Sequence, residues 1–186
     1  MIPIHLDPKY ARIALIGRSE LTVRRLAWLR AGRAEPDVWS DDPIAELAES
    51  AAGSLQLGLP GANLIASYHA IWIADLEPDV AAGLAGLARA AGVLVNVEDV
   101  LAYCDFHTPA VERRGLLTLS AGTGGASPAA ARVARAQLAR AFPPIWAQAL
   151  AEISAAREAL RATGAGPSVV AADARTRLAA FGLLAE

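Results

Sequence analysis

The sequence predicts an α/β fold in which a parallel sheet carries helices on both faces and a helical region follows. Short apolar, β-branched runs alternate with helical stretches up to residue 95, which is the pattern of repeated strand–helix units. One further strand and a glycine-rich turn come next, and the remainder of the chain contains only helical stretches. With 186 residues, the chain is long enough for one domain with an appendage or for two small domains.

The first part begins with a short apolar strand or entry segment at 2–6 and a clearer strand at 11–16, which ends at Gly17. A helix is predicted at 20–31 because apolar and basic side chains recur near helical spacing, and it is expected to end at Gly32. Further strands are predicted at 37–40, 55–60, 69–74 and 93–95, and further helices at 43–52 and 78–91. This alternation favours strands that run parallel to one another.

A different pattern begins after Pro109. The charged stretch 112–115 predicts an exposed turn, and 116–120 predicts a strand that leads into the glycine-rich turn 122–125. Helices are predicted at 128–141, 145–162 and 169–185, separated by Pro143-Pro144 and by 163–167. Ser127 is the expected N-cap of the first of these helices, and Pro128 suits its first turn.

Composition and charge exclude several classes of protein. The net charge of −2 and the pI near 5.9 argue against a nucleic-acid groove, and no apolar run approaches the ~20 residues that span a bilayer. The first residues lack the regions of a signal peptide, and the single cysteine, Cys104, excludes an intrachain disulfide or a multi-cysteine metal cage. We therefore expect a cytoplasmic protein with no nucleic-acid partner, no membrane partner and no resident metal.

A dinucleotide-binding fingerprint would lie between the first strand and its helix, at residues 17–22. The fingerprint has glycine at three positions, and only Gly17 matches, because Ser19 and Thr22 replace the second and third glycines. An ordinary strand-to-helix turn is the alternative interpretation. Ser19 can still offer its hydroxyl and amide to a phosphate at the helix N-terminus, and Arg18 can add a charge-assisted contact.

A second candidate region surrounds Asp99, which follows a buried strand and Asn96. A carboxylate at a strand end can act as a general base or capture a metal, whereas in a simple turn it only caps the backbone. The turn at 122–125 forms either a nest of amides for an anion or a tight connection. The three histidines show no metal-ligand spacing, and His107 alone lies between Asp99 and this turn.

Three segments follow a known pattern in order and spacing. They are Val93-Leu94-Val95-Asn96-Val97-Glu98-Asp99, Phe106-His107-Thr108-Pro109-Ala110 and Gly122-Thr123-Gly124-Gly125-Ala126-Ser127-Pro128. The pattern is a strand with Asn-Val-x-Asp, then Phe-x-x-Pro-Ala/Ser, then Ser-Thr/Ser-Gly-Gly-x-Ser-Pro. Over about residues 1–160, the chain resembles the precorrin-2 dehydrogenase/sirohydrochlorin ferrochelatase family, the N-terminal module of sirohaem synthase.

This resemblance implies a Rossmann-like NAD/tetrapyrrole domain at 1–110, a dimerisation domain at 111–143 and a helical C-terminal domain at 144–186. It implies a homodimer that oxidises precorrin-2 to sirohydrochlorin with NAD, often followed by insertion of Fe(II) to give sirohaem. Asp99 matches the aspartate proposed to serve both steps. The implied substrate contacts are Thr123, Gly124, Gly125 and His107, and the implied cofactor contacts are Gly17, Arg18, Ser19, Asp75 and Asn96.

Departures from the family pattern affect the expected NAD site most. The glycine motif is altered, and Ala74-Asp75-Leu76-Glu77 stands where the family has Ala-Thr-Asp/Asn-Asp. The tetrapyrrole side keeps its pattern, so an NAD-independent sirohydrochlorin metal chelatase and a non-catalytic tetrapyrrole-binding protein stay open as alternatives. Arginines such as Arg113, Arg114 and Arg132 are reasonable partners for the carboxylates of the macrocycle.

Overall fold

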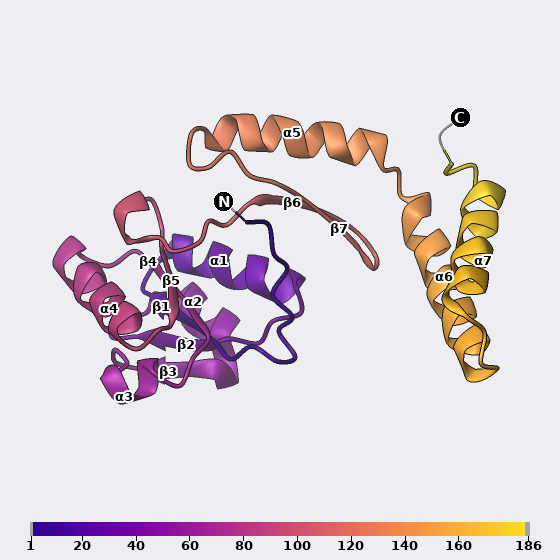
Figure 1. Cartoon of the computed structure of the whole chain (residues 1–186). Helices are drawn as coiled ribbons and strands as arrows, with labels where there is room; N and C mark the ends of the chain where they lie inside the picture. Colours follow the sequence, from indigo (N-terminus) through magenta and orange to yellow (C-terminus); the bar gives the residue numbers. More distant parts are fainter. Residues whose placement is uncertain (1, 185–186) are drawn as a thin grey trace. The chain divides into compact units, whose positions relative to one another are not determined.

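The computed structural model describes residues 2–184 and divides into two compact units, Met1–Thr108 and Pro109–Glu186 (Figure 1). Each unit is described by itself. The predicted division at 1–110, 111–143 and 144–186 stays a prediction. Residue 185, the predicted end of the last helix, lies outside the described residues.

The first unit is built on a five-stranded parallel sheet with the strand order β3-β2-β1-β4-β5. Its strands are β1 (Ile13–Gly17), β2 (Asp37–Ser40), β3 (Leu55–Leu57), β4 (Ala70–Ala74) and β5 (Leu94–Val97). The chain runs outward from β1 to β3 and then returns to β4, so the strand order reverses between β1 and β4. Ligands of open α/β sheets bind at the carboxyl ends of strands beside such a reversal. The predicted Rossmann-like parallel sheet is confirmed.

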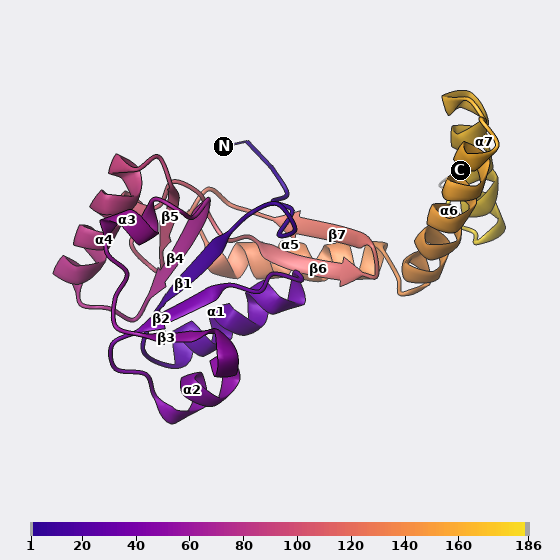
Figure 2. The same cartoon turned by 90° about the horizontal axis from the view of Figure 1, so that it is seen from below.

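Helices cover both faces of this sheet, as Figure 2 shows. Successive residues of a strand point to opposite faces. Leu15 therefore joins the core under α1 (Glu20–Ala31) and α2 (Ala45–Ala51), while Ile16 joins the core under α4 (Pro78–Ala90). The short helix α3 (Ala62–Ile65) and the 3₁₀ turns η1 (Ala52–Ser54) and η2 (Leu101–Tyr103) lack a sequence signal, because none is long enough to show helical periodicity.

The structure shows the second of the two predicted alternatives at residues 2–6, and it corrects the prediction for 112–115. Residues 2–6 form no strand, and Ile2 and Ile4 are exposed, so this stretch is an entry segment. The stretch 112–115 is not simply an exposed turn, because β6 (Ala110–Arg114) pairs antiparallel with β7 (Leu117–Ala121). The turn between these strands begins at Gly115, whose φ of 57° favours glycine.

The second unit combines this hairpin with α5 (Pro128–Ala141), α6 (Ile145–Ala162) and α7 (Pro167–Ala180). Ser127 caps α5 as predicted, since its hydroxyl accepts a hydrogen bond from the amide of Ala130 at 3.1 Å. Glu112 joins β6 to α5 by accepting hydrogen bonds from Arg114 and from Arg135. Ion pairs therefore support a unit whose hairpin residues are mostly half-buried.

Candidate functional site at the carboxyl ends of the strands

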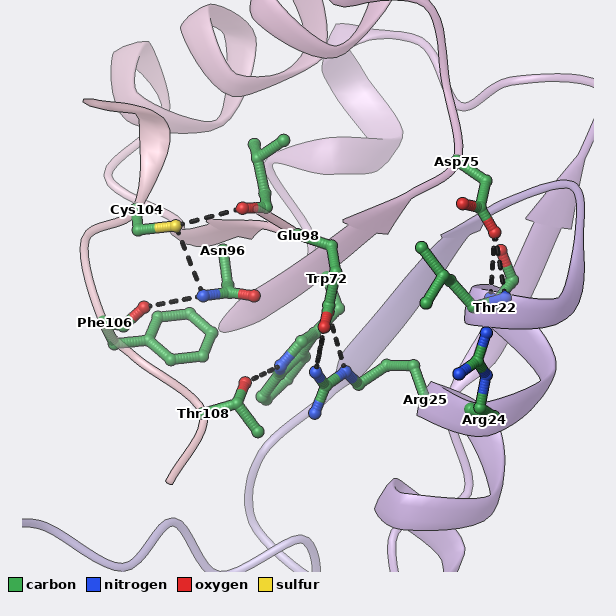
Figure 3. Close-up of polar contacts among 12 residues, drawn as sticks. Thr22, Arg24, Arg25, Trp72, Asp75, Asn96, Glu98, Cys104, Phe106 and Thr108 are labelled. Atoms are coloured by element: carbon green, nitrogen blue, oxygen red, sulfur yellow. Dashed lines mark hydrogen bonds and ion pairs between the residues drawn. The ribbon is translucent and has the colours of Figure 1, made fainter. Parts of the chain in front are cut away.

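Six sequence-predicted residues lie at one edge of the first unit's sheet, where the parallel strands end. Gly17 ends β1, and Arg18 and Ser19 connect it to α1. Asp75 follows β4, and Asn96 lies near the end of β5, with Asp99 in the loop beyond it. Figure 3 shows polar contacts at this edge, among them those of Asp75, Asn96 and Glu98. Thr123, Gly124 and Gly125 belong to the second unit.

Gly17 has no room for a side chain. A Cβ at this position would lie 2.2 Å from the carbonyl oxygen of Ala74 and 2.2 Å from Oγ1 of Thr22. Thr22 is fully buried, and its hydroxyl finds no hydrogen-bond partner among the described residues. The tight strand-to-helix turn is therefore kept, with the threonine side chain filling the space beside the glycine.

The carboxylate of Asp75 caps the N-terminus of α1. Its Oδ2 accepts hydrogen bonds from the Ser19 hydroxyl at 2.5 Å, the Leu21 amide at 3.0 Å and the Thr22 amide at 3.3 Å. Asp75 has a φ of 55°, a left-handed conformation that aspartate adopts more readily than most residues. A negative group thus lies at the positive end of α1, where a dinucleotide-binding fold places the pyrophosphate.

Arg18 is engaged by two carboxylates. Its Nε and Nη2 donate to the two oxygens of Asp41 at 2.7 Å each, and its Nη1 donates to Glu77 at 2.5 Å. These hydrogen bonds raise the pKa of Arg18, and the bonds from Arg18 lower the pKa of Asp41. The guanidinium is therefore already neutralised within the first unit.

Asp41 is a further candidate site residue, which the sequence analysis does not name. It directly follows β2, and dinucleotide-binding sheets carry the acidic residue that binds the adenosine ribose at this place. The signal was an acidic residue roughly 20 positions after the first glycine of the fingerprint. The sequence alone gives Asp41 little weight, because only one of the three glycines of the dinucleotide-binding fingerprint is present.

Asn96 holds the loop that follows β5. Its buried side-chain amide donates to the carbonyl of Phe106 at 2.8 Å and to Sγ of Cys104 at 3.4 Å. The Cys104 thiol donates to the carbonyl of Val97 at 3.1 Å, and its burial raises its pKa. Asn96 and Cys104 therefore fix the loop that carries Asp99, and His107 lies half-buried just beyond it.

The two neighbouring carboxylates in this loop have different surroundings. Glu98 forms a bidentate pair with Arg25 on α1, with the closest atoms 2.7 Å apart (Figure 3). Arg25 also lies over the ring of Trp28. Asp99 is exposed, has a φ of 61° and makes no side-chain hydrogen bond or ion pair with any described residue. Glu98 is thus held in an ion pair within the first unit, while the Asp99 carboxylate has no side-chain partner among the described residues.

A small pocket of about 100 Å³ opens between the ends of β4 and β5. Its walls are mainly apolar and include Ile73, Val97 and Tyr103, with Asp75 and Glu98 at its polar side. Asp99 lies between two lining residues, Glu98 and Val100, without lining the pocket itself.

Among residues 2–184, no three histidine, cysteine, aspartate or glutamate side chains are grouped to hold a metal ion.

The glycine-rich turn of the second unit is closed by its own hydrogen bonds. The Thr123 hydroxyl accepts from the Ser127 amide and donates to the Ser127 carbonyl, each at 3.1 Å. Gly124 and Gly125 have φ angles of 64° and 85°, so both positions favour glycine.

Within the described part of the chain, no helix is both long and apolar enough to cross a membrane.

Comparisons with known proteins agree with this geometry. Residues 4–110 match the model of a family described as "Putative NAD(P)-binding". The chain is 30% identical to the siroheme synthase of Nitrosococcus oceani over 148 residues and 31% identical to that of Methylococcus capsulatus over 145 residues. These matches cover 78% and 76% of this chain but 32% and 31% of the relatives, so the chain spans about a third of their length.

A solved structure named "SirC, precorrin-2 dehydrogenase" has a similar fold. Its TM-score is 0.69 at 18% sequence identity, and the match covers 99% of this chain and 100% of that chain. The family resemblance predicted from the three sequence motifs is confirmed.

Proposed function

Because the chain belongs to this NAD(P)-binding family, we propose that it is a dehydrogenase of sirohaem synthesis, which uses NAD to oxidise precorrin-2 to sirohydrochlorin. The observation that carries this proposal is the position of Asp99 beyond β5, at the same edge of the sheet as the Gly17 turn. The similarity to siroheme synthases supports the substrate class.

The first unit offers two features that fit a dinucleotide. The Gly17 turn is too tight for any residue with a side chain, as in the first glycine of a dinucleotide-binding turn. The Asp41 carboxylate follows β2, where dinucleotide-binding folds bind the adenosine ribose. Ser19 would face the phosphates, and NAD would supply the hydride acceptor. Each oxygen of Asp41 accepts one hydrogen bond from Arg18, which leaves further lone pairs that can accept from a ribose.

Asp99 is the proposed catalytic base. Oxidation of precorrin-2 removes two hydrogen atoms, one as a hydride and one as a proton, and the proton needs an acceptor near the macrocycle. An exposed carboxylate without an internal partner can take that proton, and a positioned base typically contributes about 10²–10⁴-fold in rate. His107 is the next candidate base, and we propose Thr123, Gly124 and Gly125 as substrate contacts in the second unit.

Insertion of Fe(II) into sirohydrochlorin is a second candidate activity. It releases two pyrrole protons as the metal enters, and Asp99 can accept them in turn. One observation favours an NAD-independent chelatase as the alternative: the place of the cofactor's pyrophosphate is taken by Asp75. A non-catalytic tetrapyrrole-binding protein is the remaining alternative.

We also propose a homodimer that works in the cytoplasm, with the second unit as the contact. Strand β7 pairs with β6, but the second unit still exposes two large apolar residues. These are Leu116 and Val133, whose relative solvent exposures are 56% and 60%. Pairing of the same surface from two copies would cover these side chains. Sedimentation at micromolar concentration is expected to give a dimer, and a monomer would contradict this proposal.

An anaerobic assay separates the candidate activities. The protein is incubated with precorrin-2 with and without NAD, and Fe(II) is then added to sirohydrochlorin in a second reaction. Sirohydrochlorin formed only with NAD supports the dehydrogenase. Sirohaem formed faster than in a protein-free control, without any NAD-dependent oxidation, supports the chelatase, and tight sirohydrochlorin binding with neither reaction supports the binding protein.

A further inference from the structure

The hydrogen bonds of Asp75 are those that a bound phosphate would make. A hydroxyl and two amides converge on one carboxylate oxygen at the first turn of α1. Backbone amides at a helix N-terminus are also the donors that hold the pyrophosphate in dinucleotide-binding folds. We propose that Asp75 is a built-in competitor for the cofactor, whose carboxylate has to leave α1 before the pyrophosphate of NAD can bind. This inference rests on the proposed function.

Electrostatics strengthens the competition. A pyrophosphate that reached the α1 N-terminus while Asp75 stayed in place would meet another negative charge at contact distance. Arg18, which follows β1 at this turn, is already paired with Asp41 and Glu77. Asp75, Asp41 and Glu77 are three carboxylates around the Arg18 guanidinium, and withdrawal of Asp75 removes the negative charge that lies at the α1 N-terminus itself.

Asp75 is attached to α1 through its side chain. It follows β4 in a left-handed conformation, with a φ of 55°, and its side-chain bonds to Ser19 and Leu21 are those that the pyrophosphate would replace. Asp75 also lines the small pocket between β4 and β5. Loss of the cap would therefore alter one wall of this pocket and would free the amides of Leu21 and Thr22 together.

The competition has a quantitative consequence. The apparent affinity for NAD equals the intrinsic affinity multiplied by the fraction of molecules in which the α1 N-terminus is open. If Asp75 occupies it in most molecules, removal of the charge is expected to tighten NAD binding by about tenfold or more. The affinity for a ligand without phosphates is not expected to change.

The test is isothermal titration of the full chain and of Asp75→Asn with three probes: NAD, ADP-ribose and adenosine. Asp79→Asn is the matched control, since Asp79 is an exposed aspartate of the first turn of α4 whose side chain makes no hydrogen bond or ion pair with any described residue. Asp75→Ser is a second variant, because it removes the carboxylate and leaves a small hydroxyl that can still accept a hydrogen bond. Circular dichroism checks that each variant is folded.

We expect Asp75→Asn and Asp75→Ser to bind NAD and ADP-ribose about tenfold more tightly than the parent, with adenosine binding and Asp79→Asn unchanged. NAD affinity within twofold of the parent would overturn the inference, as would an equal gain in Asp79→Asn, which would reflect net charge alone. A parent that reduces NAD with precorrin-2 while Asp75→Asn gains no affinity would overturn this inference and leave the proposed function standing. Absence of NAD binding in every form, together with no NAD-dependent turnover, would overturn both.

Discussion

Ser19 and Asp75 follow neighbouring strands, β1 and β4, and the Ser19 hydroxyl donates to the Asp75 carboxylate at 2.5 Å. Together with the amide bonds from Leu21 and Thr22, this contact closes the turn that begins α1. The same residues that would receive a cofactor therefore stabilise the protein without it.

Removal of the cap is expected to destabilise the fold. Asp75→Ala leaves the first amides of α1 without their acceptor, and loss of a helix N-cap typically costs about 1 kcal/mol. Urea denaturation followed by circular dichroism measures the free energy of unfolding. Asp79→Ala, which removes an exposed carboxylate with no such bonds, is the control, and equal stability of the two variants would show that Asp75 is no cap.

Gly17→Ala is expected to disrupt the turn. The added methyl would lie 2.2 Å from a backbone oxygen and 2.2 Å from Thr22, and overpacking of this kind typically costs about 1–3 kcal/mol. Gly83→Ala is the matched control, because nothing lies within 4 Å of a Cβ there and alanine favours the interior of α4. Thermal unfolding should show a lower Tm for the first variant and an unchanged or higher Tm for the second.

The ion pair between Arg18 and Asp41 predicts a dependence of stability on pH. The pKa of Asp41 is lowered in the folded chain, so the pair contributes fully above the ordinary aspartate pKa of about 3.9. Its contribution is lost as the pH falls below that value and passes through the lowered pKa. Urea denaturation at pH 7 and pH 3 should therefore show a larger loss for the parent than for Arg18→Met, and equal losses would contradict the assignment.

Asp99→Ala is expected to lower turnover far more than substrate affinity. Loss of a positioned base typically costs about 10²–10⁴-fold in rate, whereas the exposed side chain contributes no bond to the described fold. Steady-state kinetics with precorrin-2 and a titration with sirohydrochlorin measure the two effects. The contrasting variant is Glu98→Gln, which breaks the pair with Arg25 and should lower the Tm. Turnover of Asp99→Ala within a few-fold of the parent would make Asp99 a turn residue and His107 the next base to examine.

The parallel sheet was predictable because each of its central strands carries its own signal. The β-branched runs of β1 and β4 are buried on both faces, so they read as continuous apolar segments. The hairpin strand β6 gave no such signal, because Glu112, Arg113 and Arg114 are charged. Glu112 is instead satisfied by Arg114 and Arg135, a pairing that only the folded second unit creates.

The candidate site was predictable in position but not in its contacts. Strand ends and motif spacing located Gly17, Asp75 and Asp99, since these depend on local sequence. That Asp75 reaches back to α1 depends on the order in which β1 and β4 lie in the sheet, across 56 residues of sequence. The bond between Arg18 and Asp41 likewise depends on β2 lying beside β1.

The most direct test of the account is the coupling between NADH and sirohydrochlorin. The parent protein is mixed anaerobically with precorrin-2 and NAD, and both products are followed by absorbance as the reaction proceeds. The account predicts that NADH and sirohydrochlorin form in equal amounts and that both disappear in Asp99→Ala. Sirohydrochlorin formed at the same rate without NAD, or no product above the protein-free control, would contradict it.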